Sequence, residues 1–171
     1  MATINSANIY QTPNAAGSIL YPGQPAFTAY VSSTITDVTG DGTVYGPVIF
    51  DSELFDQNSD YNTGTGQFVA PVSGRYMFAG ALDMRPLTAS HTIILIQIVT
   101  SNRTYNVFDS NAAIRFTFGA TNILRYPFAI FADMDAADTA YVQLTVSNDT
   151  KTVGINGSTT LFSYWYGTLL S

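Results

Sequence analysis

The sequence predicts an all-β domain, a sandwich or barrel of about ten antiparallel strands. No amphipathic helical period is sustained anywhere in the 171 residues. Short runs rich in Val, Ile, Phe, Tyr and Thr are instead separated by Asn, Gly and Ser, as in proteins built from many strands and turns. Several runs alternate strictly between apolar and polar residues, 139–147 most clearly. This period of two predicts strands with one buried face.

The predicted strands follow one another from residue 27 to near the end of the chain. We expect them at residues 27–33, 67–72, 75–84, 92–100, 104–108, 112–119, 122–131, 139–147 and 159–170. Residues 37–43 have the composition of a turn. In 112–119, the inward side chains should be Ile114, Phe116 and Phe118.

Two of the predicted strands are apolar on both faces. Residues 93–99 and 161–170 place apolar side chains at successive positions instead of alternating ones. The outer face of an isolated antiparallel sandwich is normally polar. We therefore expect a neighbouring subunit to cover the outer face of these strands.

Residues 1–24 differ from the rest and are expected to form an extended N-terminal arm, with the folded domain spanning 25–171. The arm has loop composition, with a few apolar residues set among polar ones. These candidate arm contacts are Ile4, Ile9, Tyr10, Ile19, Leu20 and Tyr21. We interpret the arm as a segment that docks on a surface; a floppy tail is the alternative.

The charge pattern excludes one class of partner and favours another. The net charge is −6, and the six Lys and Arg residues are scattered along the chain, which argues against a nucleic-acid binder. Only 11% of the residues are charged, compared with roughly 25% in ordinary domains. This favours a chain that covers much of its surface in an assembly, although an Asn-, Thr- and Ser-rich surface is the alternative. No secretory signal and no run of ~20 apolar residues is visible, so neither export nor membrane insertion is expected.

Candidate catalytic residues are few, and we expect that this protein is not an enzyme. There is no cysteine, the only histidine is His91, and the only glutamate is Glu53. No nucleophile elbow accompanies them. We therefore predict no catalytic residues.

Two acidic segments are candidate metal sites. Residues 37–42 resemble half of a calcium loop, but Val48 stands where the twelfth-position acid is expected, so a β-turn is the preferred interpretation. Asp133, Asp135 and Asp138 are interpreted as solvated loop carboxylates, with calcium binding or an interface contact as alternatives. We predict no cofactor and no metal ligands, and calcium remains the alternative.

The segment 50–78 carries a resemblance to a known family. It reads FDSELFDQNSDYNTGTGQFVAPVSGRYMF and resembles the globular head of the q subunit of the first complement component, in the tumour-necrosis-factor-like superfamily. The positions that fill the family pattern are Phe50, Asp56, Tyr61, Phe68, Gly74, Tyr76 and Phe78. Residues 25–29 and 167–170 resemble its opening and closing strands. Gly80 stands where the family usually has another aromatic residue, which predicts a gap for a bulge or a neighbouring side chain.

The resemblance implies an antiparallel jelly-roll sandwich of about ten strands, a homotrimer, and binding through loops and sheet edges without catalysis. Vertebrate members carry a collagen stalk, whereas this chain has no Gly-x-y repeat. Similar domains occur in phage and bacterial surface proteins. Our first hypothesis is a bacteriophage capsid decoration or cement protein, on the virion surface, that docks on a capsid protein through its arm. The alternative is the receptor-binding head of a phage fibre or tail that recognises a host glycan or surface protein.

Overall fold

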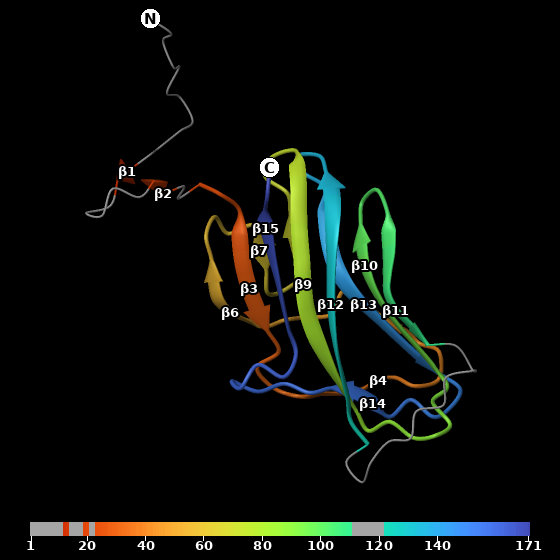
Figure 1. The fold of residues 1–171 in the computed structure, drawn as a ribbon. Coiled ribbons are helices and arrows are strands. Elements are labelled where there is room, and N and C mark those ends of the chain that lie inside the picture. Colours follow the sequence, from red (N-terminus) through yellow and green to blue (C-terminus); the bar gives the residue numbers. More distant parts are fainter. Residues whose placement is uncertain (1–11, 14–18, 21–22, 111–121) are drawn as a thin grey trace, which may run out of the picture.

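The computed structural model describes residues 12–13, 19–20, 23–110 and 122–171. Two antiparallel sheets form a sandwich (Figure 1), and a separate short ladder joins β1 (Thr12–Pro13) to β2 (Ile19–Leu20). The predicted all-β, jelly-roll class is confirmed. Among the described residues, the two sheets contain six and seven strands, more than the ten or so expected, because several strands are very short.

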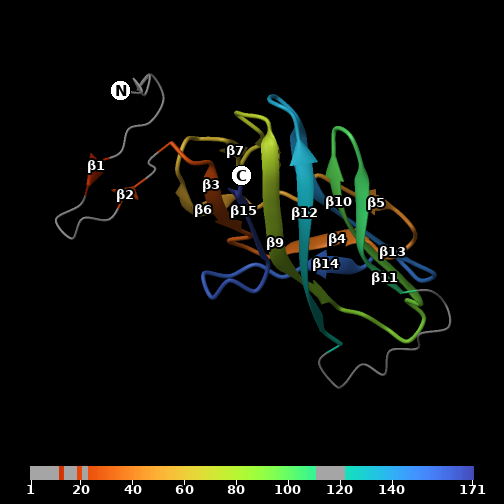
Figure 2. The ribbon, with the colours of Figure 1, turned by 45° about the horizontal axis from the view of Figure 1, so that its top comes forward.

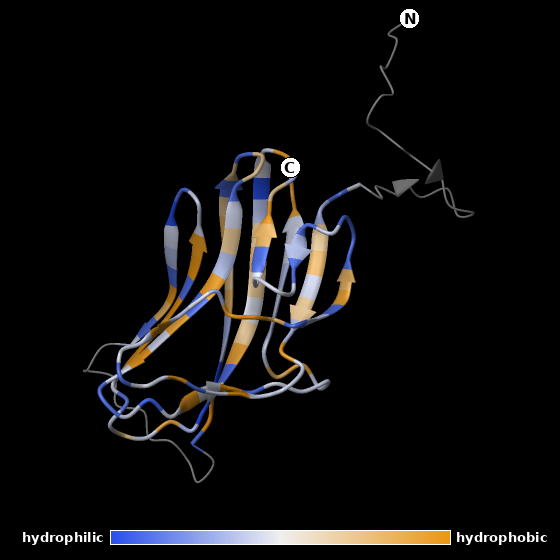
Figure 3. Ribbon diagram, turned by 180° about the vertical axis from the view of Figure 1, so that it is seen from behind, coloured by the Kyte–Doolittle hydropathy of each residue, from blue (hydrophilic) through white to orange (hydrophobic). Residues whose placement is uncertain are grey.

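The smaller sheet is organised around β13 (Thr139–Ser147), which pairs with β10 along almost its full length. From one edge to the other, the order is β11 (Thr104–Ser110), β10 (Ile93–Thr100), β13, β8 (Gln67–Val69) and β7 (Tyr61–Asn62). The two-residue β5 (Val44–Tyr45) also pairs with β13. The loop that joins β10 to β11 is hydrophilic, whereas hydrophobic residues recur along the two strands (Figure 3).

The larger sheet is organised around β9 (Gly74–Arg85), the longest strand. One edge of β9 pairs first with β15 and then with β14, and the other edge pairs with β12 (Leu124–Met134). Apart from β12, the order of strands across this sheet is β4 (Ile35–Thr39), β14 (Val153–Ile155), β9, β15 (Tyr164–Leu169), β3 (Ala26–Tyr30) and β6 (Ser52–Asp56). β4 and β14 lie at the end of the sandwich opposite the C terminus, and β12 lies beside the β10–β11 hairpin (Figures 1 and 2).

The core between the sheets is aromatic at one end and aliphatic at the other. Trp165 is fully buried, and its ring lies 5.4 Å from that of Phe78 and 5.1 Å from that of Phe27. Alternation along the strands supplies the rest, because every second residue of β10 and β13 points inward. The aliphatic part contains Leu82, Met84, Ile94, Ile96, Ile98, Val142, Leu144 and Val146.

Some predicted boundaries are wrong for local reasons. The turn expected at 37–43 begins later, because β4 continues to Thr39; the turn proper uses positive φ angles at Gly40 and Gly42. The last strand begins at Tyr164, not at 159, and Leu161 in the preceding loop has a φ of 57° that no strand allows. The short strands β5, β7 and β14 were missed because two or three residues show no period.

Several sequence predictions fall on residues outside the described part. The strand predicted at 112–119, with Ile114, Phe116 and Phe118, lies there, and so does most of the arm. Of the candidate arm contacts, Ile4, Ile9, Tyr10 and Tyr21 lie outside it. Ile19 and Leu20 are described only as the backbone of β2.

Gly80 does not form a bulge. It pairs with Trp165 on one side and Phe128 on the other, without a shift of register. A Cβ atom there would lie 2.3 Å from the Tyr164 carbonyl oxygen and 3.0 Å from Cζ of Phe128. The prediction of a bulge is therefore wrong, while the alternative, a neighbouring side chain at this position, agrees with the place of the Phe128 ring. Close approach of the β15 backbone explains why this position needs glycine.

Candidate interaction surface

The aromatic motif residues lie in the core and not at a surface site. The side chains of Phe50, Tyr61, Phe68, Tyr76 and Phe78 are all at most 4% exposed. The Tyr61 hydroxyl donates to the Phe50 carbonyl over 3.2 Å, and burial raises the pKa of this phenol. Their role is to fill the sandwich.

The two non-aromatic motif residues hold turns and ends in place. Asp56 accepts hydrogen bonds from the backbone N–H groups of Asp60 and Tyr61, at 3.2 and 2.9 Å, and so fixes the turn before β7. Gly74 lies against the end of the chain, where a Cβ atom would be 2.7 Å from Leu169 Cδ1 and from the Ser171 carbonyl oxygen.

The other polar candidates make local structural contacts. His91 is 2% exposed, and its Nδ1 accepts the Thr88 N–H at 3.0 Å. Asp138 accepts the backbone N–H of Asp135 at 2.8 Å, as expected of a loop carboxylate. Asp133 lies within β12, so its assignment to a loop is wrong. Within the described ranges, no three His, Cys, Asp or Glu side chains gather as a metal site would require. Over the same ranges, no helix has the length and apolar character to cross a membrane.

The outer face of the larger sheet has a largely apolar centre. Alternation turns Trp165 into the core and therefore turns Tyr164 and Tyr166 outward, where their rings stack at 6.5 Å and 6°. Small residues stand beside them on β9 and β12, so the surface is hollowed by about 350 Å³. The hollow is lined by Ala79, Gly80, Pro127, Phe128, Ala129, Tyr164 and Tyr166, and we call this surface the tyrosine face.

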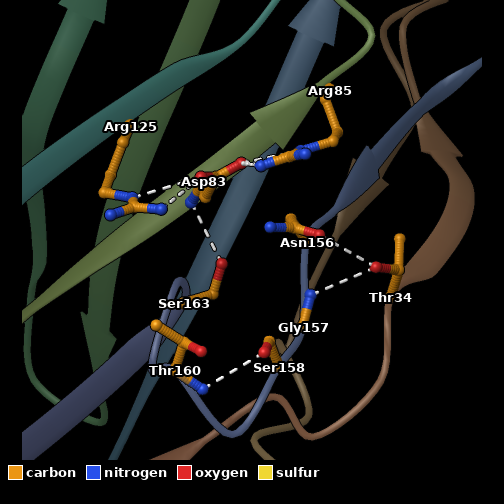
Figure 4. A network of polar contacts seen from close by, with 9 residues as sticks. All are labelled: Thr34, Asp83, Arg85, Arg125, Asn156, Gly157, Ser158, Thr160 and Ser163. Atoms are coloured by element: carbon orange, nitrogen blue, oxygen red, sulfur yellow. Dashed lines mark hydrogen bonds and ion pairs between the residues drawn. The ribbon is translucent and has the colours of Figure 1, made fainter.

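An ion cluster around Asp83 lies further along β9 from the tyrosine face, beyond the pairing of Ala81 with Tyr164. Figure 4 shows its polar contacts. Asp83 is only 1% exposed. One of its carboxylate oxygens accepts hydrogen bonds from Nε and Nη2 of Arg85, and the other accepts them from Nε and Nη2 of Arg125, at 2.7–3.1 Å. Arg125 also lies over the ring of Phe162, 4.6 Å from its centroid. The loop before β15 joins in, because Ser163 Oγ accepts the Asp83 N–H at 3.0 Å.

Both carboxylate oxygens of Asp83 are hydrogen-bonded to arginines, and its N–H is bonded to Ser163. These contacts link β9, β12 and the loop before β15. With two guanidinium groups and one carboxylate, the cluster carries one net positive charge. Sequence reasoning missed this cluster, since only the register of β9 and β12 brings Arg125 opposite Asp83.

The family is decided by a match over most of the chain. The model of the C1q domain matches residues 26–163. The chain belongs to the C1q domain family. Its domains and those of tumour-necrosis-factor-like proteins are non-enzymatic ligand-binding modules that typically form homotrimers.

Similar solved structures show the same fold. The globular domain of zebrafish complement 1qA protein has 16% identity and a TM-score of 0.55, covering 86% of this chain and 98% of that one. Murine APRIL has 9% identity and a TM-score of 0.54, with coverage of 86% and 99%. Eiger TNF from S. frugiperda has 12% identity and a TM-score of 0.56, with coverage of 86% and 93%. No curated protein gives a significant match.

Proposed function

We propose that this C1q domain is a non-enzymatic binding head that assembles into a homotrimer through its tyrosine face. The observation that carries the proposal is an apolar, hollowed outer face on the larger sheet, in a chain with only 11% charged residues. Such a face on a β-sandwich is normally polar. An apolar face of this kind is typical of a protein interface.

A closed trimer requires one surface of each protomer to fit a different surface of the next. The tyrosine face offers the receiving surface: Tyr164 and Tyr166 are half-buried, and Ala79 and Ala129 form a floor that leaves room for an incoming side chain. Tyrosine suits such a position, because its ring is apolar and its hydroxyl finds a polar partner at the rim.

A charge placed on the floor of the hollow should prevent assembly. Ala129 is exposed on β12, so Ala129→Arg should fold normally but bring an unpaired guanidinium into each of three contacts. We expect the trimer to dissociate at micromolar concentration, seen as a fall in mass by light scattering, with an unchanged far-ultraviolet circular dichroism spectrum.

The matched control is Val44→Arg, on β5 of the smaller sheet, where the side chain is 58% exposed. We expect this variant to remain a trimer. Dissociation of both variants, or of neither, would contradict assembly through the tyrosine face.

The place of the head in a larger particle is a separate proposal. The arm and the low charge support a capsid decoration protein on a bacteriophage virion, with a fibre or tail head for host attachment as the alternative. The comparisons give no support for a phage origin, so both remain predictions. Copurification of the chain with virus particles would support the virion placement, and its absence from purified particles would contradict it.

A further inference from the structure

A second hollow, of about 420 Å³, lies between the edges of the two sheets, at the end of the sandwich that carries the C terminus. The larger sheet contributes residues from the start of β9 and the end of β12, and the smaller sheet contributes the tip of the β10–β11 hairpin (Figure 1). Residues that line it include Arg75, Asn102, Arg103, Tyr105, Phe131 and Asp133. Ligand pockets typically have volumes of about 300–1,000 Å³, so the hollow is large enough for a small molecule.

Two exposed arginines line this hollow, and no described residue pairs with either guanidinium group. The chain has six basic residues, of which the structure describes all but Arg115. Two of these, Arg85 and Arg125, are bound to Asp83. Within the described part of the chain, neither Arg75 nor Arg103 makes a side-chain hydrogen bond or ion pair.

Asp133 does not neutralise the hollow. It stands directly opposite Arg75 in the β9–β12 ladder, yet no ion pair between described residues joins them. Two arginines and one aspartate line the hollow, and a second carboxylate, Asp138, is held beside it by Asn102. No ion pair between described residues engages Arg75 or Arg103, so their guanidinium donors can bind an anionic ligand.

The backbone that carries both arginines is held on both sides. Arg75 donates its N–H to the Ser171 carbonyl and accepts the Leu170 N–H at its own carbonyl, both over 2.8 Å. Arg103 is held by Thr100, whose N–H donates to the Arg103 carbonyl over 2.8 Å.

The hairpin tip is also fastened to the next loop, because the Asn102 amide donates to Asp138 over 2.5 Å. A site built on fixed backbone loses little free energy to ordering when a ligand binds.

We propose that this hollow binds an anionic saccharide. A carboxylate or sulfate would lie between Arg75 and Arg103, since planar guanidinium groups bind such oxyanions through paired hydrogen bonds. The apolar face of the sugar ring would lie on Tyr105 and on Phe131, whose side chain is 67% exposed. Asp133 would accept hydrogen bonds from ring hydroxyls.

Other anions use less of this surface. A small inorganic anion would leave the aromatic wall unused. A nucleic-acid backbone would bring many phosphates against a domain with a net charge of −6. The inference deepens the proposed function by naming its ligand class; it rests on the domain being a binding head and not on the trimer.

The test is a calorimetric titration of the full chain with three probes: a tetrasaccharide of galacturonic acid, its neutral galactose counterpart, and a sulfated tetrasaccharide. We expect at least one acidic probe to bind at least tenfold more tightly than the neutral one, and to lose affinity as salt rises. The acidic probe that binds more tightly identifies carboxylate or sulfate as the recognised group. Equal binding of all three, or no binding of either acidic probe at millimolar concentration, would overturn the proposal.

Variants locate the site. Arg75→Gln combined with Arg103→Gln should weaken binding of the acidic probe at least tenfold. Lys151→Gln removes one positive charge from an exposed residue that does not line the hollow, and it should have no effect. Unchanged affinity in the double variant, or equal losses in the double variant and the control, would place the ligand elsewhere and overturn the assignment.

A third variant, Phe131→Ser, separates a ligand site from a contact between copies. Weaker saccharide binding with an unchanged mass supports the ligand site, whereas a change of mass with unchanged binding shows that the wall is an interface. Mass measured on the same samples also separates the two proposals. Binding by a monomer would contradict the proposed assembly alone, and a trimer that binds no acidic probe would overturn this inference alone.

Discussion

Trp165→Ala is expected to lower the free energy of unfolding by about 3–5 kcal/mol, the usual cost of removing a large aromatic side chain from a core. Trp165 is 0% exposed, and four aromatic rings lie within 6.1 Å of it. These rings belong to Phe27, Phe50, Tyr61 and Phe78. The cavity would lie in the aromatic part of the core, where strands of both sheets hold the surrounding side chains and limit their collapse.

The measurement is urea denaturation followed by far-ultraviolet circular dichroism, because the variant lacks the chain's only tryptophan. All proteins must be compared at one concentration, since assembly adds to apparent stability. Phe55→Ala is the control: this aromatic side chain is 51% exposed on β6, and its removal should cost less than about 1 kcal/mol. A loss for Trp165→Ala as small as that of the control would contradict the description of the core.

Gly80→Ala is expected to lower the free energy of unfolding by about 2–3 kcal/mol, although it adds a single methyl group. The new Cβ would lie 2.3 Å from the Tyr164 carbonyl oxygen and 2.8 Å from Trp165 Cα. Both atoms are backbone, so they cannot move aside as a side chain would, and β9 and β15 would have to separate locally. An aromatic residue, which the family usually has here, should prevent folding to this structure.

Thermal unfolding measured by calorimetry is the check for Gly80→Ala, and Gly23→Ala is its matched control. At Gly23 a Cβ atom would meet nothing within 4 Å, so its melting temperature should stay within a degree or two of the parent's. If Gly80→Ala also keeps the parental melting temperature, the close approach of β9 and β15 is wrong.

Local pattern was enough to predict the long strands. For β13 the predicted and observed bounds coincide at Thr139–Ser147, because its residues alternate strictly between apolar and polar. The bounds of β9 differ by one residue at each end, and Gly74 marks its start. The spacing of aromatic residues from Phe50 to Phe78 predicted the family, because each position fills a fixed place in the core.

The surfaces were harder to predict, because they depend on pairing between distant strands. The tyrosine face was foreseen only as an apolar outer side of residues 161–170, without the small residues on β9 and β12 that hollow it. Arg75 and Arg103 were two scattered charges in the sequence. Only the meeting of β9 with the β10–β11 hairpin brings them to one hollow, and no spacing in the sequence marks that.

Sedimentation equilibrium of the unmodified chain tests the central claim most directly. A homotrimeric C1q head should show a single species with three times the chain mass of 18.4 kDa at micromolar concentration. Ala129→Arg in the same experiment should show the mass of one chain, and Val44→Arg that of three. A species of 18.4 kDa for the unmodified chain across the whole concentration range would contradict the account.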